Sequence, residues 1–163
     1  MENHSPTIDS SHEPSPLLNF VCATLADIKE VAGRMVNFVA AGQRCFALYG
    51  DVGAGKTTFT KYFIQHLNPD TVDVTSPTFS LVQIYKMSNG LPDLWHADCY
   101  RLKSQNEIEE LGLEDAFSSS IVIIEWPNII EKFLPRNTVK IYITTRPDNT
   151  RNIKIAAPAM EFL

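Results

Sequence analysis

Apolar residues along this chain form two kinds of pattern, short continuous runs and positions spaced three or four residues apart. Short runs predict buried strands, and the wider spacing predicts helices with one apolar face. The runs predict strands over residues 17–22, 44–49, 80–86, 91–97, 121–124, 139–145 and 152–157. The spacing predicts helices over residues 25–41, 57–67, 107–117 and 128–133.

Polar residues at the ends of these runs support the assignment. Thr24 suits the N-cap of the first helix, and Asp27, three residues on, supplies the acid of a capping box. Gly42 marks the end of that helix. The dipeptide Asn89-Gly90 favours a tight hairpin turn, and a turn over 146–149 joins the last two strands.

The run 121–124 (IVII) is the most apolar in the chain and fits a central parallel strand that is buried on both faces. The two hairpins require antiparallel strands as well. We therefore expect an α/β fold with a mixed central β-sheet flanked by helices.

A glycine-rich segment, residues 50–58 (GDVGAGKTT), fits the phosphate-binding pattern G-x-x-x-x-G-K-[ST] between a predicted strand and a predicted helix. Glycines let the backbone approach phosphate, and the amides at the helix start attract the anion. Lys56 would reach the β- and γ-phosphates, and the Thr57 hydroxyl would bind Mg²⁺. The plainer alternative is a glycine turn followed by an exposed lysine. The pattern predicts a single P-loop NTPase-like domain whose nucleotide contacts are Val52, Gly53, Ala54, Gly55, Lys56, Thr57 and Thr58.

Two carboxylates end predicted strands. Asp98 closes the strand 91–97 and could act on Mg²⁺ or on the attacking water, or could be a helix cap or surface charge. Glu125 follows the most apolar strand, where an unpaired carboxylate is costly, and is therefore a second candidate for the Mg²⁺ site. His96, considered alone, is more often structural than catalytic.

Hydroxyl residues gather in a loop about twenty residues after the glycine-rich segment, at Thr75, Ser76 and Thr78. Pro77 keeps Ser76 out of the helical region. The segment is either an ordinary loop or a switch that senses the γ-phosphate.

Composition narrows the class of protein. The 163 residues suit one domain, 17–163, preceded by a polar segment, 1–16, that we expect to be a disordered tail. A net charge of −5 argues against direct nucleic-acid binding. Three widely spaced cysteines indicate neither a disulfide framework nor a zinc site. Without an apolar run of roughly 20 residues or a signal pattern, we expect a cytoplasmic protein that does not bind membranes.

Four motifs occur together in order, at residues 50–58, 76–79 (SPTF), 96–101 (HADCYR) and 125–127 (EWP). In this combination the chain resembles the bacterial TsaE family, formerly YjeE, of tRNA threonylcarbamoyladenosine biosynthesis proteins. The resemblance covers about residues 17–157. It implies the ATP-hydrolysing subunit of a complex with TsaB and TsaD, which makes N6-threonylcarbamoyladenosine at position 37 of tRNAs that read codons starting with A.

The resemblance also implies roles for particular residues. Lys56 and the loop would hold the phosphates of ATP, Thr57 and Glu125 would serve Mg²⁺, and Asp98 would orient or activate the attacking water. Thr24 and Arg151 are further candidates for contacting the nucleotide. The subunit would hydrolyse ATP slowly alone and faster with its partners, and would not itself transfer the threonylcarbamoyl group.

Two other functions fit the phosphate-binding pattern. A small-molecule kinase shares it but usually carries a lid with clustered arginines, which this sequence lacks. A nucleotide-sensing adaptor would bind ATP without useful hydrolysis, and the two carboxylates at strand ends argue against it.

Overall fold

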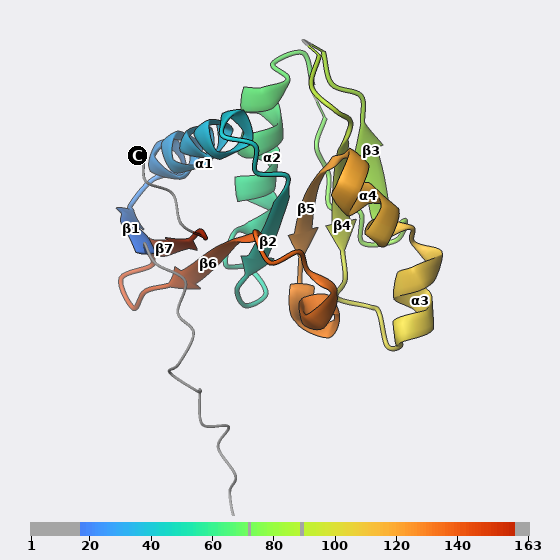
Figure 1. Ribbon diagram of the computed structural model, residues 1–163. Helices are drawn as coiled ribbons and strands as arrows, with labels where there is room; N and C mark the ends of the chain where they lie inside the picture. Colours follow the sequence, from blue (N-terminus) through green and yellow to red (C-terminus); the bar gives the residue numbers. More distant parts are fainter. Residues whose placement is uncertain (1–16, 72, 89, 159–163) are drawn as a thin grey trace, which may run out of the picture.

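The computed structural model describes residues 17–71, 73–88 and 90–158, and within this part of the chain a seven-stranded sheet forms the centre (Figure 1). The strands are β1 (Leu17–Cys22), β2 (Cys45–Tyr49), β3 (Val82–Tyr85), β4 (Leu94–Asp98), β5 (Ile121–Glu125), β6 (Val139–Thr145) and β7 (Arg151–Ala156). Their order is β1-β7-β6-β2-β5-β4-β3. The four middle strands, β6, β2, β5 and β4, run parallel, and β1, β7 and β3 pair antiparallel. The predicted mixed sheet is confirmed.

Helices cover the sheet on both faces. They are α1 (Leu25–Ala40), α2 (Lys56–Leu67), α3 (Gln105–Glu110), α4 (Leu113–Ser119) and the 3₁₀ helix η1 (Pro127–Phe133). Figure 1 shows α1 and α2 side by side, and α3 and α4 together near β3, β4 and β5. One apolar cluster joins α1 and α2 to the sheet, and a second joins α3, α4 and η1 to its other face.

Strand β5 connects the two clusters. Ile121 and Ile123 belong to the cluster under α1 and α2, whereas Val122 and Ile124 belong to the other. Because side chains alternate along a strand, a continuous apolar run is needed where both faces are covered. The prediction that 121–124 is a central strand buried on both faces is confirmed, since β5 lies between β2 and β4 and is buried throughout.

The N-terminus of α1 has the predicted capping box. The Asp27 carboxylate accepts hydrogen bonds from the Thr24 amide at 2.8 Å and the Ala23 amide at 2.9 Å. The Thr24 hydroxyl in turn accepts from the Asp27 amide at 3.2 Å. These bonds lower the pKa of Asp27, chiefly through the Thr24 backbone amide. The box fixes where the chain turns from β1 into α1.

The single helix predicted over 107–117 is wrong, because the chain forms two short helices there, α3 and α4. Gly112 lies between them with φ of +71°, a left-handed conformation that breaks helical hydrogen bonding and that glycine adopts at little cost. The apolar spacing continues through the break, so it does not reveal it.

The predicted hairpin is present, since β3 pairs antiparallel with β4. Both strands end earlier on the hairpin side than predicted, and the last residue pair of their ladder is Tyr85 with Leu94. The tight turn predicted at Asn89-Gly90 stays a prediction, because Asn89 lies outside the described residues.

The expected tail, residues 1–16, also lies outside the described residues. Within the described ranges, none of the helices combines the length and apolar character needed to cross a membrane. Cys22, Cys45 and Cys99 are free and buried, and burial raises the pKa of the Cys45 and Cys99 thiols to about 12.

Candidate active site

Three neighbouring parallel strands end at the same edge of the sheet and bring the predicted chemical groups together. Strand β2 leads into the glycine-rich loop, and β4 and β5 end in Asp98 and Glu125. Asp98 pairs with Glu125 in the β4–β5 register, and Leu48 pairs with Glu125 in the β2–β5 register. The carboxyl edge of an open α/β sheet is the usual position of a ligand site.

The glycine-rich loop passes close to strand β6. A Cβ atom added to Gly50 would lie 2.5 Å from the carbonyl oxygen of Ile143. A side chain at this position therefore requires the backbone to move. The close approach fixes the start of the loop, whose last residues form the N-terminus of α2, where free amides and the helix dipole attract anions.

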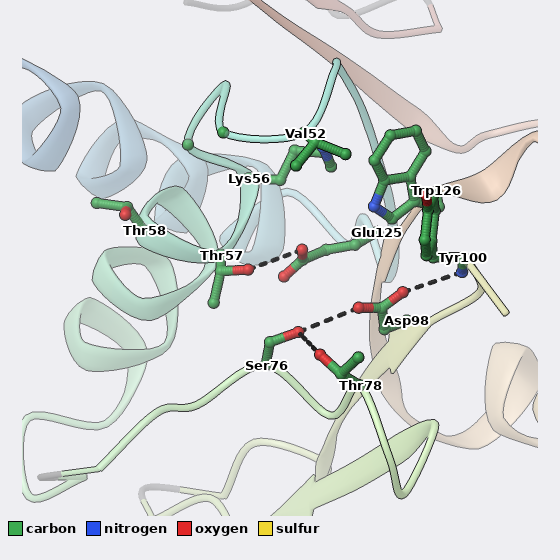
Figure 2. A pocket seen from close by; sticks show the side chains of 12 residues that line it. Val52, Lys56, Thr57, Thr58, Ser76, Thr78, Asp98, Tyr100, Glu125 and Trp126 are labelled. Carbon is green, nitrogen blue, oxygen red and sulfur yellow. Dashed lines mark hydrogen bonds between the residues drawn. The ribbon is translucent and has the colours of Figure 1, made fainter.

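A cavity of about 460 Å³ opens between this loop and the two carboxylates (Figure 2). Most predicted phosphate and metal contacts line it, together with Ser76 and Thr78 of the predicted switch segment, whereas Thr75 does not. Its lining residues are Val52, Gly53, Gly55, Lys56, Thr57, Thr58, Ser76, Thr78, Asp98, Tyr100, Glu125 and Trp126. Ala54 lies outside this lining, on the opposite side of the loop.

Thr57 and Glu125 are directly linked. The Thr57 hydroxyl donates to Glu125 Oε2 at 2.9 Å, as the dashed line in Figure 2 shows. The other carboxylate oxygen, Oε1, lies 2.8 Å from Nε2 of the buried His96. Glu125 is only 2% exposed, so these two partners satisfy a carboxylate that burial would otherwise make costly.

The Lys56 ammonium is buried beside the loop. Its Nζ atom donates to the carbonyls of Gly50 at 2.6 Å and Asp51 at 2.8 Å, and lies 3.9 Å from the centre of the Trp126 ring. Burial lowers the pKa of Lys56, and the negative charges of Glu125, Asp98 and Asp51 oppose this effect.

Asp98 is held by the switch segment and by its own strand end. Its Oδ2 accepts from the Ser76 hydroxyl at 3.1 Å, and its Oδ1 accepts from the Tyr100 amide at 3.0 Å. The Ser76 hydroxyl also lies 3.0 Å from that of Thr78 (Figure 2). Ser76, predicted as part of a switch, is thus in contact with the carboxylate predicted to act on water, and Thr78 contacts Ser76.

Trp126 adopts an unusual backbone conformation, with φ of +58°. A residue before proline is normally extended, so the left-handed conformation of Trp126 before Pro127 is strained. The indole packs against Tyr100, with ring centres 4.7 Å apart, and forms one wall of the cavity. Strain of this kind is concentrated at functional sites.

A second cavity, of about 270 Å³, lies on the other side of the loop and contains both weaker nucleotide candidates. Thr24 and Arg151 line it together with Gly53, Ala54 and Thr58 of the loop. Arg151 Nε donates to the Ala54 carbonyl at 2.9 Å, and its Nη1 donates to the Asn149 carbonyl at 2.6 Å. Arg151 therefore ties the loop to the start of β7.

Two features of the site were not predicted from the sequence. Arg101, the last residue of the motif 96–101, lies with its guanidinium 4.7 Å from the ring centre of Phe79. The contact between His96 and Glu125 was not predicted. The sequence holds one indication of this contact: His96 and Asp98 are two residues apart, so they lie on the same face of β4, next to the strand that ends in Glu125.

The donor set fits Mg²⁺ rather than a metal held wholly by protein. The described ranges contain no group of three or more His, Cys, Asp or Glu side chains that could hold a metal ion. Mg²⁺ usually takes one or two protein ligands, with water and substrate phosphate supplying the rest. Because Thr57 donates its proton to Glu125, its oxygen lone pairs are available on the cavity side.

A glycine-rich phosphate loop between β2 and α2, with carboxylates at the ends of two neighbouring strands, defines a P-loop nucleotide-binding protein of the α/β class. Comparison with known proteins then identifies the family. Residues 22–153 match the model of the family described as "Threonylcarbamoyl adenosine biosynthesis protein TsaE", and the chain belongs to this TsaE family.

Individual relatives agree with this assignment. The chain is 40% identical to the tRNA threonylcarbamoyladenosine biosynthesis protein TsaE of Rickettsia felis over 70% of this chain and 66% of that protein. It is 36% identical to the protein of the same name from Bacillus subtilis over 80% of each chain. The crystal structure of YdiB from Bacillus subtilis is similar over 91% of this chain and 90% of that one, with a TM-score of 0.70 and 30% identity.

Proposed function

We propose that this protein hydrolyses ATP, with Mg²⁺, to support the formation of threonylcarbamoyladenosine in tRNA. The observation that carries the proposal is the hydrogen bond from Thr57 to the buried Glu125, beneath a phosphate loop and beside Asp98. A domain that only bound phosphate would need the loop but not two carboxylates at the cavity. Membership of the TsaE family supports a role in the formation of threonylcarbamoyladenosine.

The loop residues bind the triphosphate. Amides of residues 53–58 surround the β-phosphate, and Lys56 turns from the Gly50 and Asp51 carbonyls to the β- and γ-phosphate oxygens. Thr57 and Glu125 would hold Mg²⁺, and the chemistry that the ion would supply there is neutralisation of phosphate charge. The Thr57–Glu125 bond keeps both groups oriented before nucleotide binds.

Asp98 orients the attacking water. It accepts hydrogen bonds from Ser76 and the Tyr100 amide, so its carboxylate is held at the cavity wall. Binding of a γ-phosphate would give Ser76 and Thr78 a competing partner, which would change the contact between Ser76 and Asp98. This exchange is how the segment 76–79 would sense the nucleotide.

The adenine and ribose occupy the second cavity. It lies against the opposite side of the same loop, so phosphates at residues 53–58 place the rest of the nucleotide within its reach. Thr24 and Arg151 supply polar groups there, and Cys22 and Ile28 supply apolar surface. This proposal covers the remaining predicted nucleotide contacts, including Ala54.

Partner proteins complete the site. Among the described residues that line the larger cavity, Lys56 is the only cation, and Arg101 lies on Phe79 instead. An additional cation supplied in trans can raise such rates by ~10³ to 10⁵. We expect slow hydrolysis by the isolated chain and faster hydrolysis with TsaB and TsaD, which would also provide the contacts to tRNA. Free, buried cysteines fit the reducing cytoplasm.

Phosphate release from ATP by the purified chain, alone and with TsaB and TsaD, tests this proposal. Lys56→Ala serves as the blank. We expect release that is stimulated by the partners and absent from the blank. Equal release with and without partners would contradict partner activation, and transfer of labelled phosphate to an acceptor other than water would favour a kinase.

A further inference from the structure

His96 lies in the interior of the sheet and not at its edge. It belongs to β4, pairs with Ile123 of β5 in the strand register and is fully buried. Its Nε2 atom lies 2.8 Å from Glu125 Oε1. Since an ionised carboxylate can only accept hydrogen bonds, Nε2 carries the proton and donates it. The histidine therefore approaches Glu125 from the core, on the opposite oxygen from Thr57.

The two oxygens of Glu125 are divided between two partners. His96 takes Oε1 and Thr57 takes Oε2. A glutamate side chain otherwise has several rotamers, and losing that freedom on metal binding costs affinity. Because Glu125 is bonded at Oε1 from inside the core, its carboxylate plane is fixed and Oε2 stays directed at Thr57 and the cavity. The contacts form one chain, from His96 through Glu125 to Thr57.

The other ring nitrogen of His96 argues against a purely structural role for this residue. Nδ1 is buried and has no hydrogen-bond partner among the described residues. A buried histidine that served only to connect structural elements would normally use both nitrogens, since an unsatisfied buried polar atom is costly. The ring's described polar contact is the one with Glu125. A leucine would fill the same interior position without that cost.

We propose that His96 is a positioning residue for the metal site, holding the Glu125 carboxylate in the orientation in which it and Thr57 bind the divalent cation. This inference rests on the proposed metal role of Thr57 and Glu125. Partners that orient a ligating carboxylate typically contribute 10- to 100-fold to metal affinity. His96 has this effect through Glu125 and makes no contact with nucleotide.

Metal binding without turnover provides the test. Mn²⁺, a spectroscopic substitute for Mg²⁺, is titrated into the purified chain with saturating ADP, and free Mn²⁺ is measured by electron paramagnetic resonance. The variants are His96→Leu, which removes the donor, and His96→Gln, whose amide can place a donor near the position of Nε2. Leu94→Val, two residues earlier on the same strand face, is the matched control for loss of core packing, and Glu125→Gln tests the metal site itself. Urea unfolding verifies that each variant is folded.

We expect His96→Leu to weaken Mn²⁺ binding roughly tenfold or more, His96→Gln to restore most of it, and Leu94→Val to leave it unchanged while lowering stability. If Glu125→Gln weakens Mn²⁺ binding but folded His96→Leu does not, the positioning role is refuted and the metal site stands. If neither variant changes Mn²⁺ binding, the proposed metal site is wrong and the inference falls with it. If Leu94→Val weakens binding as much as His96→Leu, general loosening of the core explains the effect and the positioning role is refuted.

Discussion

Replacing Thr57 with valine removes one hydroxyl group and keeps the branched shape of the side chain. The lost hydrogen bond, 2.9 Å long, ends on a charged carboxylate, and bonds of that kind contribute about 1.5–3 kcal/mol. Thr57 is partly exposed to the cavity, so water can replace part of the bond, and Glu125 keeps its contact with His96. We therefore expect Thr57→Val to lower the free energy of unfolding by only about 1 kcal/mol, or about 2–4 °C in Tm.

The effect on metal should be much larger than the effect on stability. Thr57→Val deletes a proposed Mg²⁺ ligand, and we expect the Mg²⁺ concentration for half-maximal phosphate release to rise at least about tenfold, equivalent to about 1.4 kcal/mol. Thr57→Ser keeps the hydroxyl and should behave like the wild type in both respects. The assay is phosphate release against Mg²⁺ concentration, with urea unfolding on the same samples. An unchanged Mg²⁺ dependence in folded Thr57→Val would refute the assignment of Thr57 as a metal ligand.

Three further changes test other parts of the structure. Gly50→Ala places a Cβ atom 2.5 Å from the Ile143 carbonyl oxygen and should lower the free energy of unfolding by about 1–3 kcal/mol. An unchanged Tm would contradict the observed approach of the loop to β6. Arg151→Ala removes the hydrogen bond to the Ala54 carbonyl and should weaken ADP binding, measured by calorimetry, about tenfold. Arg151→Lys should recover little of the ADP affinity because lysine lacks the guanidinium fork, and wild-type affinity in both variants would exclude Arg151 from the nucleotide site. Because the folded-state pKa of Asp27 is lowered, the stability that its charge contributes is complete above the ordinary value of 3.8 and is lost as pH falls through the lowered pKa. The difference in unfolding free energy between wild type and Asp27→Asn should therefore shrink below pH 3.8, and a constant difference would count against the charged capping box.

The sequence predicted those parts of the fold in which local and long-range requirements agree. The run 121–124 is apolar because both faces of β5 are covered, so composition alone identified a central strand. Thr24 and Asp27 form a capping box through backbone contacts three residues apart, a geometry that sequence spacing specifies directly. The phosphate loop is similarly local, since its glycines, Lys56 and Thr57 act within a single turn.

The wrong helix prediction and the missed contacts depend on information that residue spacing does not carry. The helix break at Gly112 depends on a positive φ, and the apolar spacing around it is compatible with one helix or two. The partner of His96 belongs to a different strand, 29 positions away, and becomes apparent only once the β4–β5 register is known. Arg101 could have paired with any nearby anion, and its position over Phe79 depends on how the segment 76–79 folds back against β4.

The most direct test of hydrolysis at this strand edge is single-turnover phosphate release by Asp98→Asn in the presence of TsaB and TsaD, with ATP affinity measured on the same samples. Asparagine keeps the size of the side chain and one acceptor oxygen but removes the charge that would orient water. We expect phosphate release to fall at least about 100-fold, within the usual contribution of a positioned acid or base, while ATP affinity stays within about threefold of wild type. Release at the wild-type rate with intact binding would contradict the account and would leave the cavity as a nucleotide-sensing site.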